Sequence, residues 1–140
     1  MNKDKLMEQW DTKNSIDRMA LDIVRKENQN NFFEKAEYVL LLACCYYVRQ
    51  CFSSTDHCNL TMVQEIVNSS ISHLDSLFEE LRSNIVKMDL KETYYGSLAI
   101  KQYQLFVDST KSRETVLLSV RLQLQKYLNP CSKVATSKGN

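Results

Sequence analysis

Cysteine and histidine gather in one stretch of this chain, LLACCYYVRQCFSSTDHC, which spans residues 41–58. It holds four of the five cysteines and one of the two histidines. Cys44, Cys51, His57 and Cys58 are the four side chains that a tetrahedral zinc site would use. Zinc ligands usually arrive as two short-spaced pairs, and the stretch contains no CxxC pair. The spacing therefore predicts no metal site and no other cofactor.

The same thiols could instead serve redox chemistry. Cys51 and Cys58 flank a polar segment, so they could pair with each other, or Cys58 could act as a reactive thiol. Cys44 and Cys45 sit within an apolar run, and free cysteine is among the residue types most often buried. We expect these two to be packing residues, which leaves Cys51, His57 and Cys58 as the open chemical question.

A catalytic arrangement does not follow from the spacing of the polar residues. No Ser-His-Asp or Cys-His set is legible, and two glycines cannot build a phosphate-binding loop. An Arg followed by a His in a helical bundle resembles the HEPN family of RNases and their inactive relatives. The resemblance implies roles for Arg49 and His57, but their spacing is longer than in the family's motif, and His57 falls in a predicted loop. The alternative is that Arg49 closes a helix, where its charge suits the dipole; we predict no catalytic residue.

Five of the seven tyrosines are Tyr46, Tyr47, Tyr94, Tyr95 and Tyr103, and the first four form two doublets. Neighbouring side chains on a helix diverge by about 100°, so a doublet cannot bury both rings on one face. Tyrosine is also enriched at the energetic centres of protein interfaces. We predict Tyr46, Tyr94, Tyr95 and Tyr103 as protein-binding residues. The alternative is a wide helix face whose hydroxyls reach solvent.

The elements of secondary structure that carry these cysteines and tyrosines are predicted to be helices. The 140 residues include only 2 Gly and 1 Pro, whereas sheets need many tight turns that consume such residues. Helical spacing of apolar residues predicts helices over about 15–26, with a weak start near residue 2, and over 32–52, 60–88, 89–108 and 112–128. Whether residues 109–112 break a helix is open. The sequence predicts an all-α antiparallel bundle of four to five helices, with one domain over 1–128 and a flexible tail over 129–140.

The segment 60–88 has the clearest pattern. Its apolar residues step by three or four without a miss, which is the seam of a coiled coil: Leu60, Val63, Val67, Ile71, Leu74, Phe78, Leu81, Ile85 and Met88. Such a helix is either the spine of the bundle or long enough to offer its seam to a second subunit. We therefore predict a possible homodimer through helix 60–88.

The distribution of charged and apolar residues limits the kinds of partner that the chain is expected to bind. Residues 1–85 carry 9 basic against 13 acidic side chains, and residues 86–140 carry 9 against 4. No basic run is dense enough for a phosphate-binding stripe, so nucleic acid is an unlikely partner. The longest apolar run, Tyr38 to Val48, is much shorter than the roughly 20 residues of a membrane span, and the polar start resembles no signal peptide. With an odd number of cysteines, this predicts a cytoplasmic protein without membrane contact.

These observations favour a small non-enzymatic helical protein that acts by binding another protein. A regulator, an immunity-type inhibitor, an adaptor or a secretion chaperone would each fit. Two alternatives stay open, namely a HEPN-like RNase or inactive relative that uses Arg49 and His57, and a helical nucleic-acid-binding regulator.

Overall fold

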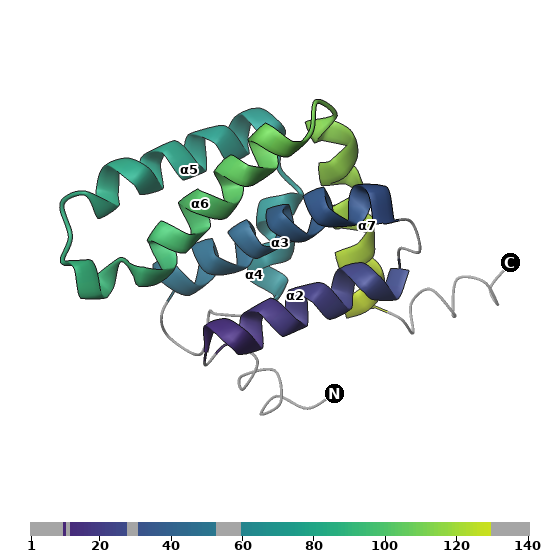
Figure 1. The fold of residues 1–140 in the computed structure, drawn as a ribbon, viewed down its shortest axis with the longest axis horizontal. Coiled ribbons are helices and arrows are strands. Elements are labelled where there is room, and N and C mark those ends of the chain that lie inside the picture. Colours follow the sequence, from purple (N-terminus) through teal and green to yellow (C-terminus); the bar gives the residue numbers. More distant parts are fainter. Residues whose placement is uncertain (1–9, 11, 28–30, 53–59, 130–140) are drawn as a thin grey trace, which may run out of the picture.

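The computed structural model describes residues 10, 12–27, 31–52 and 60–129, and every regular element within these ranges is a helix (Figure 1). The described elements are α2 (Lys13–Glu27), α3 (Asn31–Cys51), α4 (Leu60–Val67), α5 (Ile71–Ile85), the 3-10 turn η1 (Leu90–Glu92), α6 (Tyr94–Ser109) and α7 (Arg113–Leu128). The all-α class and the helical bundle are confirmed. None of the described helices is long and apolar enough to cross a membrane.

Helix α3 is the central element of the bundle. It contacts α2, α4, α6 and α7, and it runs antiparallel to both α2 and α6 (Figure 1). Its middle is buried on every side, from Val39 to Tyr46 and at Val48. A helix that is apolar all round has to be covered on most sides, which is why this segment occupies the centre.

Helices α5 and α6 form an antiparallel pair beside α3, and α7 runs across the opposite end of the molecule (Figure 1). A buried polar contact joins α7 to the centre, because the side-chain amide of Gln123 donates to the Glu37 carboxylate on α3. Both residues are almost fully inaccessible to solvent. Buried polar groups of this kind require partners, so the contact fixes how α7 docks.

The predicted helix over 60–88 is wrong as a single rod, because the chain breaks between α4 and α5. Ser70 caps α5 by accepting from the backbone N–H of His73 at 3.1 Å, and the Ser69 hydroxyl donates to the carbonyl of Ile66. Arg121 on α7 donates to the carbonyls of Val67 (3.0 Å) and Ser69 (3.2 Å). Serine side chains that bond to the local backbone compete with helix continuation. The apolar spacing hides the break because it carries on across it.

The seam of 60–88 faces the interior of the same chain. Its buried members are Leu60, Val63, Val67, Leu74, Phe78 and Leu81, and they pack where α4 meets α3 and α7 and where α5 meets α6. The last member, Met88, lies beyond α5 and is 40% exposed. A homodimer through this segment stays a prediction, but helices of the same chain already cover the seam that suggested it.

The two last predicted helices are close to the observed ones. Helix α6 begins at Tyr94 rather than near residue 89, because residues 86–93 form turns around η1. Residues 110–112 do separate α6 from α7: Thr110 is extended, and its hydroxyl accepts from the backbone N–H of Ser112 at 3.0 Å. The predicted tail lies almost entirely outside the described residues.

Candidate protein-binding surface

The cysteines of α3 behave as packing residues where the structure describes them. Cys44 and Cys45 are fully buried, as predicted, and burial raises the pKa of the Cys44 thiol to about 12. Cys51 lies at the surface end of α3, and desolvation is the main cause that raises the pKa of its thiol. A thiol with a raised pKa is a poor nucleophile at neutral pH. His57 and Cys58 lie outside the described residues, and the described ranges hold no cluster of three or more potential metal ligands.

Arg49 connects three parts of the molecule at the end of α3. Its Nε donates to the backbone carbonyl of Trp10 at 3.1 Å, and its guanidinium carbon lies 4.7 Å from the centre of the Tyr95 ring. A cation over an aromatic face is a favourable contact. The arginine therefore holds the chain before α2 and the first turn of α6 against α3. The HEPN-like role for Arg49 and His57 stays a prediction, because His57 is not described.

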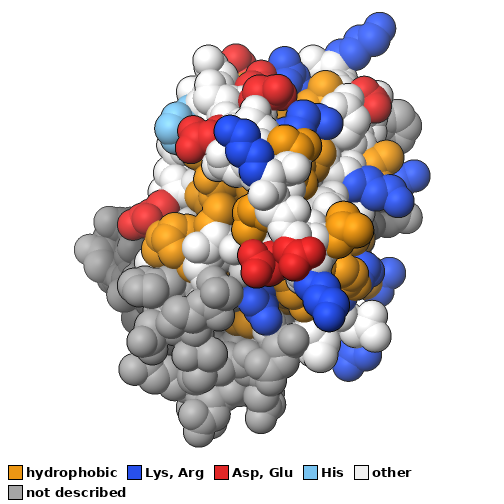
Figure 2. All heavy atoms as spheres, turned by 90° about the vertical axis from the view of Figure 1, so that its left-hand side faces the viewer, with side chains coloured by type: hydrophobic (Ala, Val, Ile, Leu, Met, Phe, Trp, Pro, Cys, Tyr) orange, Lys and Arg blue, Asp and Glu red, His pale blue; other side chains and the backbone are white. Residues whose placement is uncertain are grey.

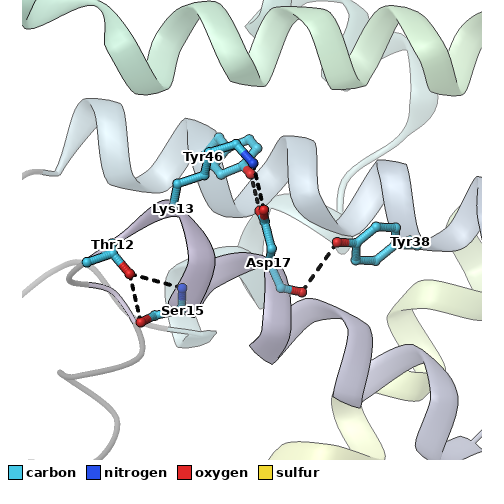
Figure 3. Close-up of polar contacts among 6 residues, drawn as sticks. All are labelled: Thr12, Lys13, Ser15, Asp17, Tyr38 and Tyr46. Atoms are coloured by element: carbon cyan, nitrogen blue, oxygen red, sulfur yellow. Dashed lines mark hydrogen bonds and ion pairs between the residues drawn. The ribbon is translucent and has the colours of Figure 1, made fainter.

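Tyr46 is buried, which corrects the prediction that it faces a partner. Its hydroxyl donates to the carboxylate of Asp17 on α2, and the other oxygen of that carboxylate lies 2.7 Å from Lys13 Nζ (Figure 3). The Tyr38 hydroxyl donates to the Asp17 carbonyl at 3.4 Å (Figure 3). Burial, followed by the bond to Asp17, raises the pKa of the Tyr46 hydroxyl. Tyr46 thus joins α2 to α3.

Tyr103 is also buried, so it does not offer its ring to a partner either. The ring stacks on Phe78 with centroids 4.1 Å apart, and the hydroxyl donates to the Asp75 carboxylate on α5. Arg113 on α7 reaches both oxygens of the same carboxylate, at 3.2 and 3.4 Å. Burial is the main cause that raises the pKa of the Tyr103 hydroxyl. Tyr103 therefore belongs to the contact among α5, α6 and α7.

The second tyrosine doublet lies at the surface. Tyr94 is 52% exposed, and its ring meets that of the half-buried Tyr95 edge-on, with centroids 5.0 Å apart. Tyr95 in turn lies 6.1 Å from the Tyr46 ring. The three rings contact one another in the order Tyr94, Tyr95, Tyr46, from the surface to the core. The exposed Tyr94 ring therefore packs against side chains that are held by the core.

Tyr94 is one of four exposed apolar side chains at the junction of α5 and α6, which we call the 86–94 corner. Val86 is 75% exposed, Met88 40% and Leu90 87%. This junction forms the left-hand end of the molecule in Figure 1, and Figure 2 shows hydrophobic side chains gathered among charged ones on that end. Single exposed apolar residues are normal, but several in one place mark an interaction site.

Hydrogen bonds from the Gln50 side chain hold the 86–94 corner in place at its α6 end. Gln50 on α3 donates to the carbonyl of Glu92 at 2.8 Å and accepts from the N–H of Gly96 at 2.7 Å. A Cβ added at Gly96 would lie 3.1 Å from Gln50 and from Ile85, so glycine allows α6 to approach α3 this closely. Thr93, buried between η1 and α6, donates through its backbone N–H to the carbonyl of Leu90 at 3.3 Å. The corner is therefore fixed to the central helix through Glu92 and the adjoining Gly96.

The sequence reasoning missed three of the four corner residues. Met88 was predicted to belong to the seam of 60–88, Leu90 fell in the predicted helix over 89–108, and Val86 fell in the predicted helix over 60–88. The signal was present, because apolar and charged residues alternate from Val86 to Lys91, a period that no helix produces. Comparison with protein-family models, with curated proteins and with solved structures found no match.

Proposed function

We propose that this chain is a protein-binding module that docks a partner protein through the 86–94 corner. The observation that carries the proposal is the exposure of Val86, Met88, Leu90 and Tyr94 within nine residues of chain. Exposed apolar groups cost free energy in water, and burying them against a partner recovers it, at about 25 cal/mol for each Å² covered.

The fixed geometry of the corner supports the same function. Gln50 and Gly96 tie it to α3, and the Tyr94 ring rests against Tyr95. A surface that is ordered before binding loses little conformational entropy on binding. Because the corner projects from the end of the bundle, the fitting partner has an apolar groove. The chain would act by occluding that groove or by holding it against the rest of the bundle.

Affinity purification from the native host, read by mass spectrometry, tests the proposal when three baits are compared. The wild-type chain and Leu105→Asp should retain the same protein, because Leu105 is 45% exposed but lies in α6 outside the corner. A Val86→Asp/Leu90→Asp chain should lose it. The recovered protein, once purified, should bind the wild type directly in calorimetry. Equal retention by all three folded baits would overturn the proposal.

The two other functions predicted from the sequence lack a supporting contact among the described residues. Arg49 is engaged with Trp10 and Tyr95, and an Arg49→Ala chain tested for RNA cleavage beside the wild type would reveal any catalytic role. Nucleic-acid binding would appear as retention of DNA or RNA that weakens with added salt.

A further inference from the structure

Helix α7 is apolar on two opposite faces. Its inward face buries Val116, Leu117, Val120 and Leu124 in the core. On the outward face, Leu118 is 49% exposed and Leu122 is 47% exposed. At about 100° per residue, the direction midway between these two leucines points directly away from Val120, which is fully buried. Leu118 and Leu122 lie outside the packed face of α7, so their exposed parts are available to another surface.

The outward face has a symmetric order of residues. Glu114, Leu118, Leu122 and Lys126 follow one another at intervals of four, and all four are exposed. The exposed Thr115 and Gln125 lie on the same face, so Thr115, Leu118, Leu122 and Gln125 follow the alternating spacing of a helix seam. Toward the start of α7, Val120 is followed by Leu118, the polar Thr115 and the acidic Glu114. Toward the end of α7, it is followed by Leu122, the polar Gln125 and the basic Lys126. Only the sign of the charge differs between the two directions.

This order is self-complementary for two antiparallel copies of α7. When two copies cross with their Val120 positions opposed, Leu118 of one lies opposite Leu122 of the other. In the same register Glu114 of one lies beside Lys126 of the other, and two-fold symmetry repeats both contacts. A two-fold interface requires a surface that complements itself in this way. The opposite charges at the two flanks select the antiparallel register, because a parallel pair would place like charges together.

We infer that the outward face of α7 binds a second copy of this chain in a two-fold antiparallel dimer. One helix face buries less than the roughly 800 Å² per partner of a standard stable interface, so the dimer is weak and depends on concentration. The α7 face and the 86–94 corner lie at opposite ends of the molecule (Figure 1). Occupation of one surface therefore leaves the other open, and the two inferences are tested independently.

Sedimentation equilibrium of the purified chain tests the dimer. The average mass should rise from the monomer value of 16.3 kDa toward twice that value over concentrations up to on the order of 1 mM. Leu118→Ser should weaken association by about tenfold or more, because it removes both central leucine contacts at once. Leu105→Ser, at a comparably exposed leucine on α6, should leave it unchanged.

Charge reversal tests the register. Glu114→Lys alone, or Lys126→Glu alone, places like charges beside each other in the dimer and should weaken association by about tenfold. The double variant Glu114→Lys/Lys126→Glu restores opposite charges and should return to within about threefold of the wild type. Circular dichroism checks that each variant is folded at the temperature used, since these charges also act on the helix dipole. A chain that stays monomeric throughout, or a double variant no better than the single ones, would overturn the inference.

Discussion

Two carboxylates that bind buried tyrosines are built from the same parts in different ways. Asp17 accepts from Tyr46 and pairs with Lys13, which lies four residues earlier on the same helix. Asp75 accepts from Tyr103 and pairs with Arg113, which comes from another helix. The first arrangement joins two helices and the second joins three. If stability depended on the number of helices joined, Asp75 would contribute more to it than Asp17.

Burial gives the opposite order. The Asp17 side chain is 24% exposed and the Asp75 side chain 46%. Tyr46 is 1% exposed, and Tyr103 is 7% exposed. A hydrogen-bonding group that water cannot reach costs more when its partner is removed. We therefore expect the Asp17 arrangement to contribute more to stability, although it connects fewer elements.

The largest expected effect is alkaline destabilisation, to which both tyrosines contribute. Their folded-state pKa values are raised above the ordinary value of about 10, so their contribution is complete below pH 10 and is lost as pH rises beyond it. Cys44, with a pKa raised to about 12, starts this loss near pH 9. The free energy of unfolding in urea should fall above pH 9, with each group adding up to about 1.4 kcal/mol per pH unit.

Single substitutions separate the two tyrosines in the same measurement. Tyr46→Phe and Tyr103→Phe should each flatten the fall in unfolding free energy above pH 10, because each removes one proton-binding difference between the folded and unfolded states. Tyr94→Phe, at an exposed ring, should leave the slope as it is. Slopes that are identical in all four proteins would show that neither hydroxyl is held protonated by the fold.

Asp17→Ala should give the next largest effect, about 2–3 kcal/mol of lost stability at pH 7, because the buried Tyr46 hydroxyl loses its acceptor. Urea unfolding followed by circular dichroism measures it. Asp22→Ala, at an exposed position on the same helix, is the matched control and should cost about 0.5 kcal/mol or less.

Asp75→Ala should cost about 1–2 kcal/mol in the same assay, less than Asp17→Ala, because solvent reaches this carboxylate more easily. The order of the two variants decides between burial and connectivity. A larger loss for Asp75→Ala would mean that joining three helices outweighs the exposure of the bond.

The ion pairs should give the smallest effects. Lys13→Gln should cost about 0.5 kcal/mol or less, because a partly exposed ion pair within one helix contributes little. Arg113→Gln should cost about 1 kcal/mol, because Arg113 reaches both carboxylate oxygens from another helix. Both losses should shrink in high salt. A salt-independent loss for Lys13→Gln would assign its effect to packing of the side-chain stem instead of charge.

The helices were predictable where composition marks their ends. Helix α3 was expected over 32–52 and spans Asn31–Cys51, because polar segments stand on both sides of its apolar run. Helix α7 was expected over 112–128 and spans Arg113–Leu128. The break at Ser69 and Ser70 was missed, because the apolar spacing continues across it and shows no interruption.

The burial of individual tyrosines could not be predicted from the sequence alone. A doublet indicates that one ring is less buried than its neighbour, but not which one. Tyr46 and Tyr103 are buried because each hydroxyl finds a carboxylate on another helix, at positions 29 and 28 residues earlier. That pairing depends on how the helices are arranged in space. Tyr94 is the exposed ring of its doublet, and its role in protein binding stays a prediction. The apolar residues beside it were assigned to helices that do not extend that far.

The bonds from Arg121 to the carbonyls of Val67 and Ser69 bear on the order of events during synthesis. They span 54 and 52 residues of chain, and the donor lies in the middle of α7, the last described helix. A nascent chain that has not yet reached Arg121 can already form the cap at Ser70, but it has no donor for these two carbonyls. The angle between α4 and α5 is therefore completed late, when α7 docks, and chains truncated before Arg121 should hold these two helices less firmly than the full-length protein does.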